Sequence, residues 1–280
     1  MSSLAQVSPA RWLWRGSELQ QVENGWQTDD TVLAADSWLV TDGRVRALEL
    51  HRERFVAACL IPRLNDPKLL PDPVHLAEFW AAMTAALPIH GDWFPKVELL
   101  RSQKGGAAEL IYVLRSAPKR TRSVVVTSHL GADPRTFPTV KGPDLLVLAG
   151  IRAAVADRVG AEEAIILSPE GYLVEGAYSA LVWWQGNELC VPPAGFARVD
   201  SVTSRALVTL AQALGVSVRE ESVRPGDLAE RELWSLSALH GIRIVREWIG
   251  GPPLAELPGR LGTWRARLDR LAHPMVTLAR

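Results

Sequence analysis

The sequence predicts a mixed α/β (α+β) protein, because segments with strand patterning and segments with helical patterning are interspersed along its 280 residues. That length suits one large domain or two smaller ones. A polar, basic run at residues 116–122 has the composition of a linker. We therefore predict two domains, at residues 1–117 and 118–280.

Composition excludes several classes of partner. The chain is 48% hydrophobic and 22% charged, with a formal net charge of zero, so neither nucleic acid nor an anionic membrane is indicated as a partner. The sequence contains no run of about 18 apolar residues, so we expect no membrane-spanning helix. The first residues lack the charged-then-apolar pattern of a signal peptide. Cys59 and Cys190 are expected to be free thiols in a reducing cytoplasm. We assign no metal-binding residues.

A hairpin and a helix are predicted early in the chain. Asp42-Gly43 stands between two apolar-rich runs, and both central residues of a type I′ turn need positive φ. A helix should follow, from about residue 48 to residue 63. His51 and Arg54 are three residues apart, so they share one face of this helix.

Further along, a second helix is predicted at Pro73–Ala86, and strands at Lys96–Leu100 and Leu110–Leu114 with a turn at Gly105-Gly106. Arg101 ends the first of these strands. By its position alone, it could be an arginine in water at the end of a strand.

The second half begins with a strand at Val124–Val126 and a loop leading to Lys141. A helix should follow the loop, with Pro143 in its first turn and Gly160 at its end. Its apolar stripe is expected at Leu145, Leu148, Ala149, Ala156 and Val159.

After that helix we predict a strand at Ala164–Leu167, a type I turn at residues 168–171 and a returning strand at Tyr172–Glu175. Ser201 is a plausible N-cap for a helix that ends near Gly215. The free N–H groups of such a helix start are suited to binding phosphate. A closing helix is expected at Arg265–Leu271.

Two groups in this half point to cofactor chemistry. Lys141 precedes the helix, and Glu175 lies 34 residues later, at the end of the returning strand. A lysine that forms a Schiff base and a carboxylate that holds a pyridine nitrogen are what a pyridoxal-phosphate site needs. Taken singly, a lysine before Gly-Pro is usually a solvated loop residue, and a glutamate before glycine is usually a turn residue.

Together with the Asp-Gly hairpin and the His-x-x-Arg helix, this pair resembles the fold-type IV pyridoxal-phosphate enzymes: branched-chain aminotransferases, D-amino acid aminotransferases and aminodeoxychorismate lyases. The resemblance covers about residues 36–250. It implies a smaller N-terminal α/β domain, a larger C-terminal pseudo-barrel domain, pyridoxal 5′-phosphate as cofactor and a homodimer.

The resemblance also implies roles for individual residues. Lys141 would carry the cofactor and then act as general base, and Glu175 and Ser179 match the family's Glu-Gly-x-x-Ser motif. The remaining cofactor-binding residues implied, most of them at the phosphate, are Arg54, Val202, Thr203, Ser237 and Ala238. The alternative is that Arg54 is an ordinary surface arginine and that residues 201–203 only cap a helix.

The branch of the family is less clearly marked. Ser237-Ala238-Leu239 is similar to the Asn-Ala-Leu of aminodeoxychorismate lyases, and Ser37 falls where those lyases carry an active-site threonine. The implied substrate-binding residues are Ser37, Arg101 and His240, although His240 could equally be structural.

The expected activity is therefore a lyase that releases pyruvate and 4-aminobenzoate, a folate precursor. The alternatives are an aminotransferase for a branched-chain or D-amino acid, and an idle homologue that binds a cofactor or a partner. Departures from the family pattern at 34–38, Asp144, Ala180 and Ser204 keep the last alternative open.

Overall fold

The computed structural model describes residues 9–22, 31–61, 70–101 and 107–275. The chain forms two compact units. The first comprises Met1–Lys119, Val140–Pro143 and Ala272–Arg280, and the second comprises Arg120–Thr139 and Asp144–Leu271. The mixed α/β expectation is confirmed. No described helix is long and apolar enough to cross a membrane.

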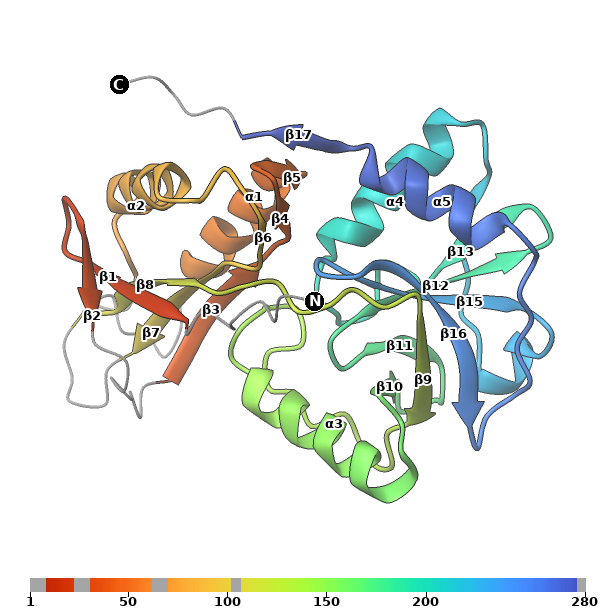
Figure 1. The fold of residues 1–280 in the computed structure, drawn as a ribbon. Coiled ribbons are helices and arrows are strands. Elements are labelled where there is room, and N and C mark those ends of the chain that lie inside the picture. The colour runs from red at the N-terminus through yellow and green to blue at the C-terminus, as the bar shows by residue number, and fades with distance from the viewer. Residues whose placement is uncertain (1–8, 23–30, 62–69, 102–106, 276–280) are drawn as a thin grey trace, which may run out of the picture. The chain divides into compact units, whose positions relative to one another are not determined.

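The first unit is built on a five-stranded antiparallel sheet with strand order β2-β1-β8-β7-β3. Helices α1 and α2 pack against one face of this sheet (Figure 1), where Phe55 and Phe79 join a core with Leu99 and Tyr112. The elements are β1 (Ala10–Trp14), β2 (Leu19–Val22), β3 (Thr31–Ser37), α1 (Leu48–Cys59), α2 (Pro73–Ala85), β7 (Lys96–Arg101) and β8 (Glu109–Leu114).

A small second sheet completes this unit, with strand order β17-β5-β4-β6. Asp42 and Gly43 connect β4 to β5 with φ values of 45° and 68°, so the predicted type I′ hairpin is confirmed. The predicted turn at Gly105-Gly106 lies outside the described residues. The first helix ends at Cys59, earlier than the predicted residue 63, because the residue before Pro62 disfavours helical backbone angles. The elements are β4 (Val40–Thr41), β5 (Arg44–Arg46), β6 (Asp92–Trp93) and β17 (Ala272–Pro274).

The second unit is built on a curled eight-stranded sheet with order β11-β10-β9-β16-β15-β12-β13-β14. Pairing is parallel for β9 with β10, β9 with β16 and β13 with β14, and antiparallel elsewhere. The strands are β9 (Ser123–Ser128), β10 (Glu163–Leu167), β11 (Leu173–Gly176), β12 (Ala180–Gln185), β13 (Glu188–Val191), β14 (Val218–Glu220), β15 (Glu232–Ser237) and β16 (Gly241–Ile249).

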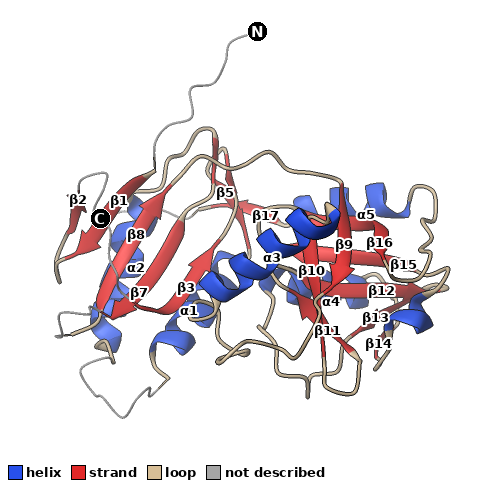
Figure 2. Cartoon of the chain, turned by 90° about the horizontal axis from the view of Figure 1, so that it is seen from below, coloured by secondary structure: helices blue, strands red, loops and turns tan. Residues whose placement is uncertain are grey.

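Strand alternation divides the side chains of this sheet between two cores. Trp234 and Leu236 of β15 pack under helices α4 (Val202–Ala213) and α5 (Arg260–Asp269), which lie close together in Figure 1. Leu233 points to the opposite face and joins Trp183 and Trp248. Helix α3 (Leu145–Val159) runs along β9 and β10 in Figure 2.

Two sequence predictions for this unit need correction. In α3 the buried residues are Ile151 and Val155, whereas Ala156 and Val159 of the expected stripe are exposed. The helix has apolar residues on several sides, so periodicity alone could not identify the face against the sheet. The closing helix begins at Arg260, five residues before the predicted start at Arg265. The prediction missed the first turn because that turn contains few of the apolar residues that indicate a helix.

Candidate active site

In the first unit, Arg54 is fixed by a buried aspartate. Asp36 of β3 is fully buried, and its carboxylate accepts from Arg54 Nε at 2.8 Å and Arg54 Nη2 at 2.7 Å. His51 Nδ1 donates to the same carboxylate at 2.9 Å. Burial opposes ionisation of Asp36, but Arg54 and His51 outweigh it and hold its pKa well below the usual range. The Arg54 guanidinium is therefore held in one orientation by a charged partner.

His51 serves this arrangement as a neutral donor. Burial lowers the pKa of His51, although Asp36 opposes that shift. A neutral ring that donates from Nδ1 leaves Arg54 as the cation paired with Asp36. The predicted face shared by His51 and Arg54 is thus directed at one carboxylate.

Asp36 was missed by sequence reasoning. The available signal was an acidic residue in the middle of an apolar strand, which requires a buried partner. Ser37, predicted to contact substrate, is buried next to it and donates its backbone N–H to Asp36 Oδ1 at 2.7 Å. Arg101, the other substrate candidate of this unit, is exposed at the end of β7.

The backbone at Lys141 is attached to the same strand. The Lys141 carbonyl accepts from Ala35 N at 2.8 Å, one residue before Asp36. Gly142 has a φ of 138°, and a Cβ there would lie 2.7 Å from the Ala34 carbonyl carbon. Only glycine permits so close an approach, so the first unit places Lys141 and the carboxylate that binds Arg54 along β3.

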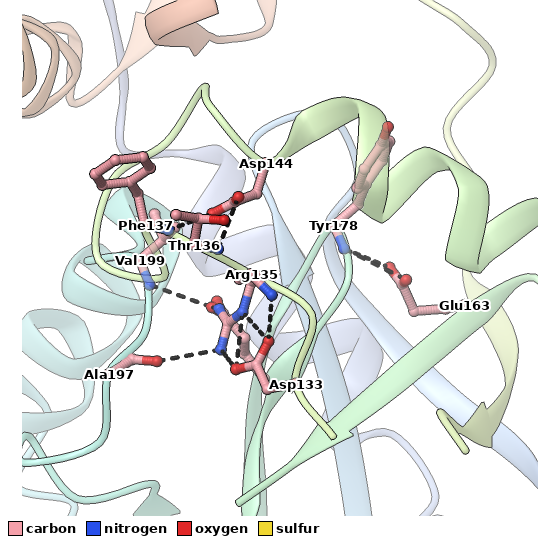
Figure 3. Close-up of polar contacts among 10 residues, drawn as sticks. Asp133, Arg135, Thr136, Phe137, Asp144, Glu163, Tyr178, Ala197 and Val199 are labelled. Atoms are coloured by element: carbon pink, nitrogen blue, oxygen red, sulfur yellow. Dashed lines mark hydrogen bonds and ion pairs between the residues drawn. The ribbon is translucent and has the colours of Figure 1, made fainter. Parts of the chain in front are cut away.

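In the second unit, Glu175 is paired with an arginine. Glu175 lies on β11 and is 6% exposed. Its Oε1 accepts from Arg135 Nη1 and from Val199 N, the latter at 3.3 Å (Figure 3). No described residue donates a hydrogen bond to Glu175 Oε2. Burial raises the pKa of Glu175 to about 7, and Arg135 limits that rise.

Arg135 is itself held in place. Its Nε and Nη2 donate to Asp133 at 2.9 and 2.7 Å, and the guanidinium is almost completely buried. Asp144 then fixes the loop, because its carboxylate accepts from the backbone N–H groups of Thr136 at 2.9 Å and Phe137 at 2.8 Å (Figure 3). Sequence reasoning noted Asp144 only as a departure from the family pattern and missed both Asp133 and Arg135.

Ser179 is oriented by a buried glutamate. Its hydroxyl donates to Glu163 Oε2 at 3.2 Å. The backbone N–H of Tyr178 also lies against this carboxylate, at 3.3 Å, and Figure 3 shows this second contact. Glu163 is fully buried on β10, and burial raises its pKa. Because its proton is directed at Glu163, the Ser179 hydroxyl can only accept further hydrogen bonds.

The start of α4 has the features of an anion site. Ser201 accepts from Ser204 N at 3.2 Å, so the predicted N-cap is confirmed. Val202 and Thr203 occupy the first turn, where no earlier helical carbonyl can accept their N–H groups. These two N–H groups and the helix dipole together favour a phosphate.

Ser237, Ala238 and His240 lie at the connection between β15 and β16. Ser237 Oγ accepts from His240 N at 3.2 Å, and His240 Nδ1 accepts from Thr121 N at 3.1 Å. Burial, and then the arginines around it, lower the pKa of His240 to about 4. His240 is therefore neutral near pH 7 and can offer a ligand only its Nε2–H.

The family model for class IV amino-transferases matches residues 33–248. The chain belongs to this family. As a class IV aminotransferase, the protein is an enzyme that depends on pyridoxal 5′-phosphate. Within the described residues, no group of three or more His, Cys, Asp and Glu side chains is arranged to hold a metal ion.

Relatives of this class IV aminotransferase differ in activity. A bifunctional aminodeoxychorismate lyase / D-amino acid transaminase from Mycobacterium tuberculosis is 27% identical over 230 residues, 73% of this chain and 77% of the relative. A branched-chain-amino-acid aminotransferase from Escherichia coli is 31% identical over 111 residues, 39% of this chain and 36% of the relative.

Solved structures share the fold. A hypothetical aminotransferase from Mycobacterium tuberculosis in its PLP-bound form matches with a TM-score of 0.76 at 20% identity, over 96% of this chain and 99% of that one. The branched-chain amino acid aminotransferase from Escherichia coli matches with a TM-score of 0.77 at 17% identity, over 94% of each chain.

The residues of this class IV aminotransferase fit the cofactor. Glu175 Oε2 is an acceptor with no described donor, as a protonated pyridine nitrogen requires. The first turn of α4 offers N–H groups to a phosphate. The Ser179 hydroxyl can accept a hydrogen bond from a ligand, and the Ser237 hydroxyl can donate one or accept one.

Proposed function

We propose that the protein is an aminodeoxychorismate lyase that uses pyridoxal 5′-phosphate. The observation that carries cofactor use is the buried Glu175 carboxylate, held through one oxygen by Arg135 and open at the other. The lyase branch is supported by Ser237-Ala238-Leu239 at the end of β15 and by the name of the Mycobacterium tuberculosis relative.

In this proposal Lys141 binds the cofactor covalently, and Glu175 holds its pyridine nitrogen protonated. Arg54, the Val202 and Thr203 amides, Ser237 and Ala238 hold the phosphate, while Ser179 accepts a hydrogen bond from the cofactor. Bound pyridoxal phosphate stabilises negative charge that develops on the substrate carbon next to the amine. With its Nζ not bound to the cofactor, Lys141 would act as the general base that accepts the proton from that carbon.

Substrate recognition is proposed for Ser37, Arg101 and His240. Ser37 is buried beside Asp36, whereas Arg101 is exposed, so the Ser37 hydroxyl is the better shielded from water of these two side chains. His240 is neutral, so in this proposal it binds substrate through a hydrogen bond and supplies no charge.

An aminotransferase is the second candidate. The same Mycobacterium tuberculosis relative is also named a D-amino acid transaminase, and the Escherichia coli relative is a branched-chain aminotransferase. The two activities differ in one requirement. A transaminase needs a keto-acid acceptor to complete its cycle, whereas the lyase forms 4-aminobenzoate and pyruvate without one. We further propose a cytoplasmic homodimer.

Borohydride reduction of the purified protein with added pyridoxal phosphate tests the first step. We expect an absorption band of the bound cofactor, and after reduction the cofactor should be found by mass spectrometry on the peptide that contains Lys141. Lys141→Ala should show no such adduct. A Lys141→Ala protein that is labelled to the same extent as the wild type would contradict the assignment.

Incubation with aminodeoxychorismate then separates the two activities. We expect 4-aminobenzoate and pyruvate in equal amounts, with no dependence on an added keto acid. A second incubation supplies a D-amino or branched-chain amino acid with a keto acid. Turnover of that amino acid only when the keto acid is present, without 4-aminobenzoate from aminodeoxychorismate, would contradict the lyase and support the aminotransferase.

A further inference from the structure

Arg243 is a buried arginine on the inner face of the curled sheet. It lies on β16 between Ile242 and Ile244, which both pack under α4 and α5, so alternation directs Arg243 to the opposite face. Ser235 is its register partner on β15 and is fully buried on the same side. The Arg243 residue is only 7% exposed.

The Arg243 guanidinium has one long hydrogen bond and no ion pair among the described residues. Its Nη2 donates to Ser235 Oγ at a long 3.4 Å, and its buried Nε has no hydrogen-bond partner. No described carboxylate lies within ion-pair distance of it. The nearby Glu163 instead pairs with Arg152 at 3.6 Å. Arginines are almost never buried without a paired anion, so this charge indicates a partner that the described residues do not supply.

The surroundings of Arg243 carry charges of both signs, with Glu163 and Glu162 acting against Arg152 and Arg265. Burial lowers the pKa of Arg243, with Glu163 and Glu162 only partly opposing the effect. His240 is kept neutral by burial and then by Arg243, Arg120 and Arg265. A buried guanidinium attracts an anion more strongly than a solvated one does.

Arg243 also lies close to residues of the proposed cofactor site. Ser237 follows Ser235 by two positions on β15 and therefore faces the same side of the sheet. Ser179 precedes β12, whose Ala180 is paired with Leu236 of β15. An anion at Arg243 would thus be a neighbour of any ligand held by Ser179 and Ser237.

We infer that Arg243 and Ser235 form an oxyanion-binding site for a carboxylate or phosphate group of a bound ligand. The two sources are the phosphate of the cofactor and a carboxylate of the amino substrate. A planar guanidinium with unused donors matches the two oxygens that either group presents. The inference rests on the proposed function for the identity of these ligands.

Thermal unfolding of the cofactor-free protein distinguishes this role from a structural one. A structural arginine would lower Tm when replaced. An unpaired buried charge destabilises the empty protein, so Arg243→Met should melt at the same temperature as the wild type or higher. Arg246→Met is the matched control, because Arg246 is exposed on the same strand.

Ligand-induced shifts in Tm identify the anion. Inorganic phosphate and malonate are added separately at constant ionic strength, and the shift gives the apparent Kd. We expect Arg243→Met to bind at least one of the two about tenfold more weakly than the wild type, as loss of a charge-assisted hydrogen bond predicts, while Arg246→Met binds normally. Arg243→Gln replaces Arg243→Met if the latter does not fold.

Cofactor analogues separate the two sources. Weaker binding of pyridoxal phosphate, with unchanged binding of pyridoxal, assigns the site to the cofactor phosphate. Unchanged phosphate and cofactor binding, with weaker malonate binding, assigns it to a substrate carboxylate. A lower Tm together with unchanged affinity for both anions would overturn the inference. Trapping of the cofactor on Lys141 is scored independently, so failure of the proposed function is seen separately.

Discussion

Replacing Arg135 with methionine should make the stability of the protein depend on pH in a new way. Arg135 is the cation that limits the rise in the pKa of Glu175, which burial brings to about 7 from its ordinary value of 4.5. A raised carboxyl pKa means that the folded state binds the proton more tightly than the unfolded state. Stability is therefore full below about pH 4.5 and falls as pH rises towards 7.

The magnitude follows from the size of that shift. At about 1.4 kcal/mol per pKa unit, ionised Glu175 costs the wild type about 3 kcal/mol, and that loss is complete above pH 7. Without Arg135 the pKa of Glu175 rises above 7. Arg135→Met should then continue to lose about 1.4 kcal/mol per pH unit above pH 7, where the contribution of Glu175 to the wild type no longer changes.

Urea unfolding of the cofactor-free proteins at pH 6, 7, 8 and 9 measures this difference. Asp133 also loses its partner, since Arg135 is the main group that lowers the pKa of Asp133 in the wild type, so a control must subtract any contribution from Asp133. The control is the same replacement in a Glu175→Gln background, where the difference should be constant. Parallel stability curves for the wild type and Arg135→Met between pH 7 and 9 would refute the reasoning.

Three other replacements test the supports of the site. Asp36→Asn should cost about 3 kcal/mol at pH 7, because it removes the buried carboxylate that binds Arg54; urea unfolding at pH 7 and at pH 3 measures the loss. The deficit should shrink below pH 4, because the stabilisation from a depressed carboxyl pKa is present above the unfolded pKa and is lost as pH falls towards the folded pKa. Gly142→Ala should lower Tm, whereas Gly150→Ala, with open space in α3, should raise stability by about 0.5–1 kcal/mol. Ser201→Ala should cost about 1 kcal/mol in denaturant unfolding by removing the cap of α4.

Local chemistry made much of the fold predictable from sequence. Asp42-Gly43 has few options other than a type I′ turn, and Ser201 before an apolar helical stripe has few options other than an N-cap. Both signals act within four residues. The burial of α3 was less predictable, because its contacts with β9 and β10 decide which apolar side faces inward.

The candidate site divides in the same way. Arg54, Lys141 and Glu175 were predicted from the family resemblance, through their order and spacing along the chain. Asp36, the partner of Arg54, and Arg135, the partner of Glu175, were not predicted. Each lies 18 or more residues from its partner in sequence, so the pairing depends on how the chain folds. Arg243 was overlooked for a similar reason, since an arginine in a strand ordinarily faces water.

The attachment of Lys141 to β3 has a consequence for synthesis of the chain. Residues 140–143 belong to the first unit, yet the residues before and after them belong to the second, and β17 returns to β5 at the far end of the sequence. When the ribosome has made the first 119 residues, two segments of the first unit, Val140–Pro143 and Ala272–Arg280, have therefore not yet been synthesised. Its folding cannot finish before the second unit has been translated, so the two should mature together, in contrast to domains that fold one after the other as they emerge.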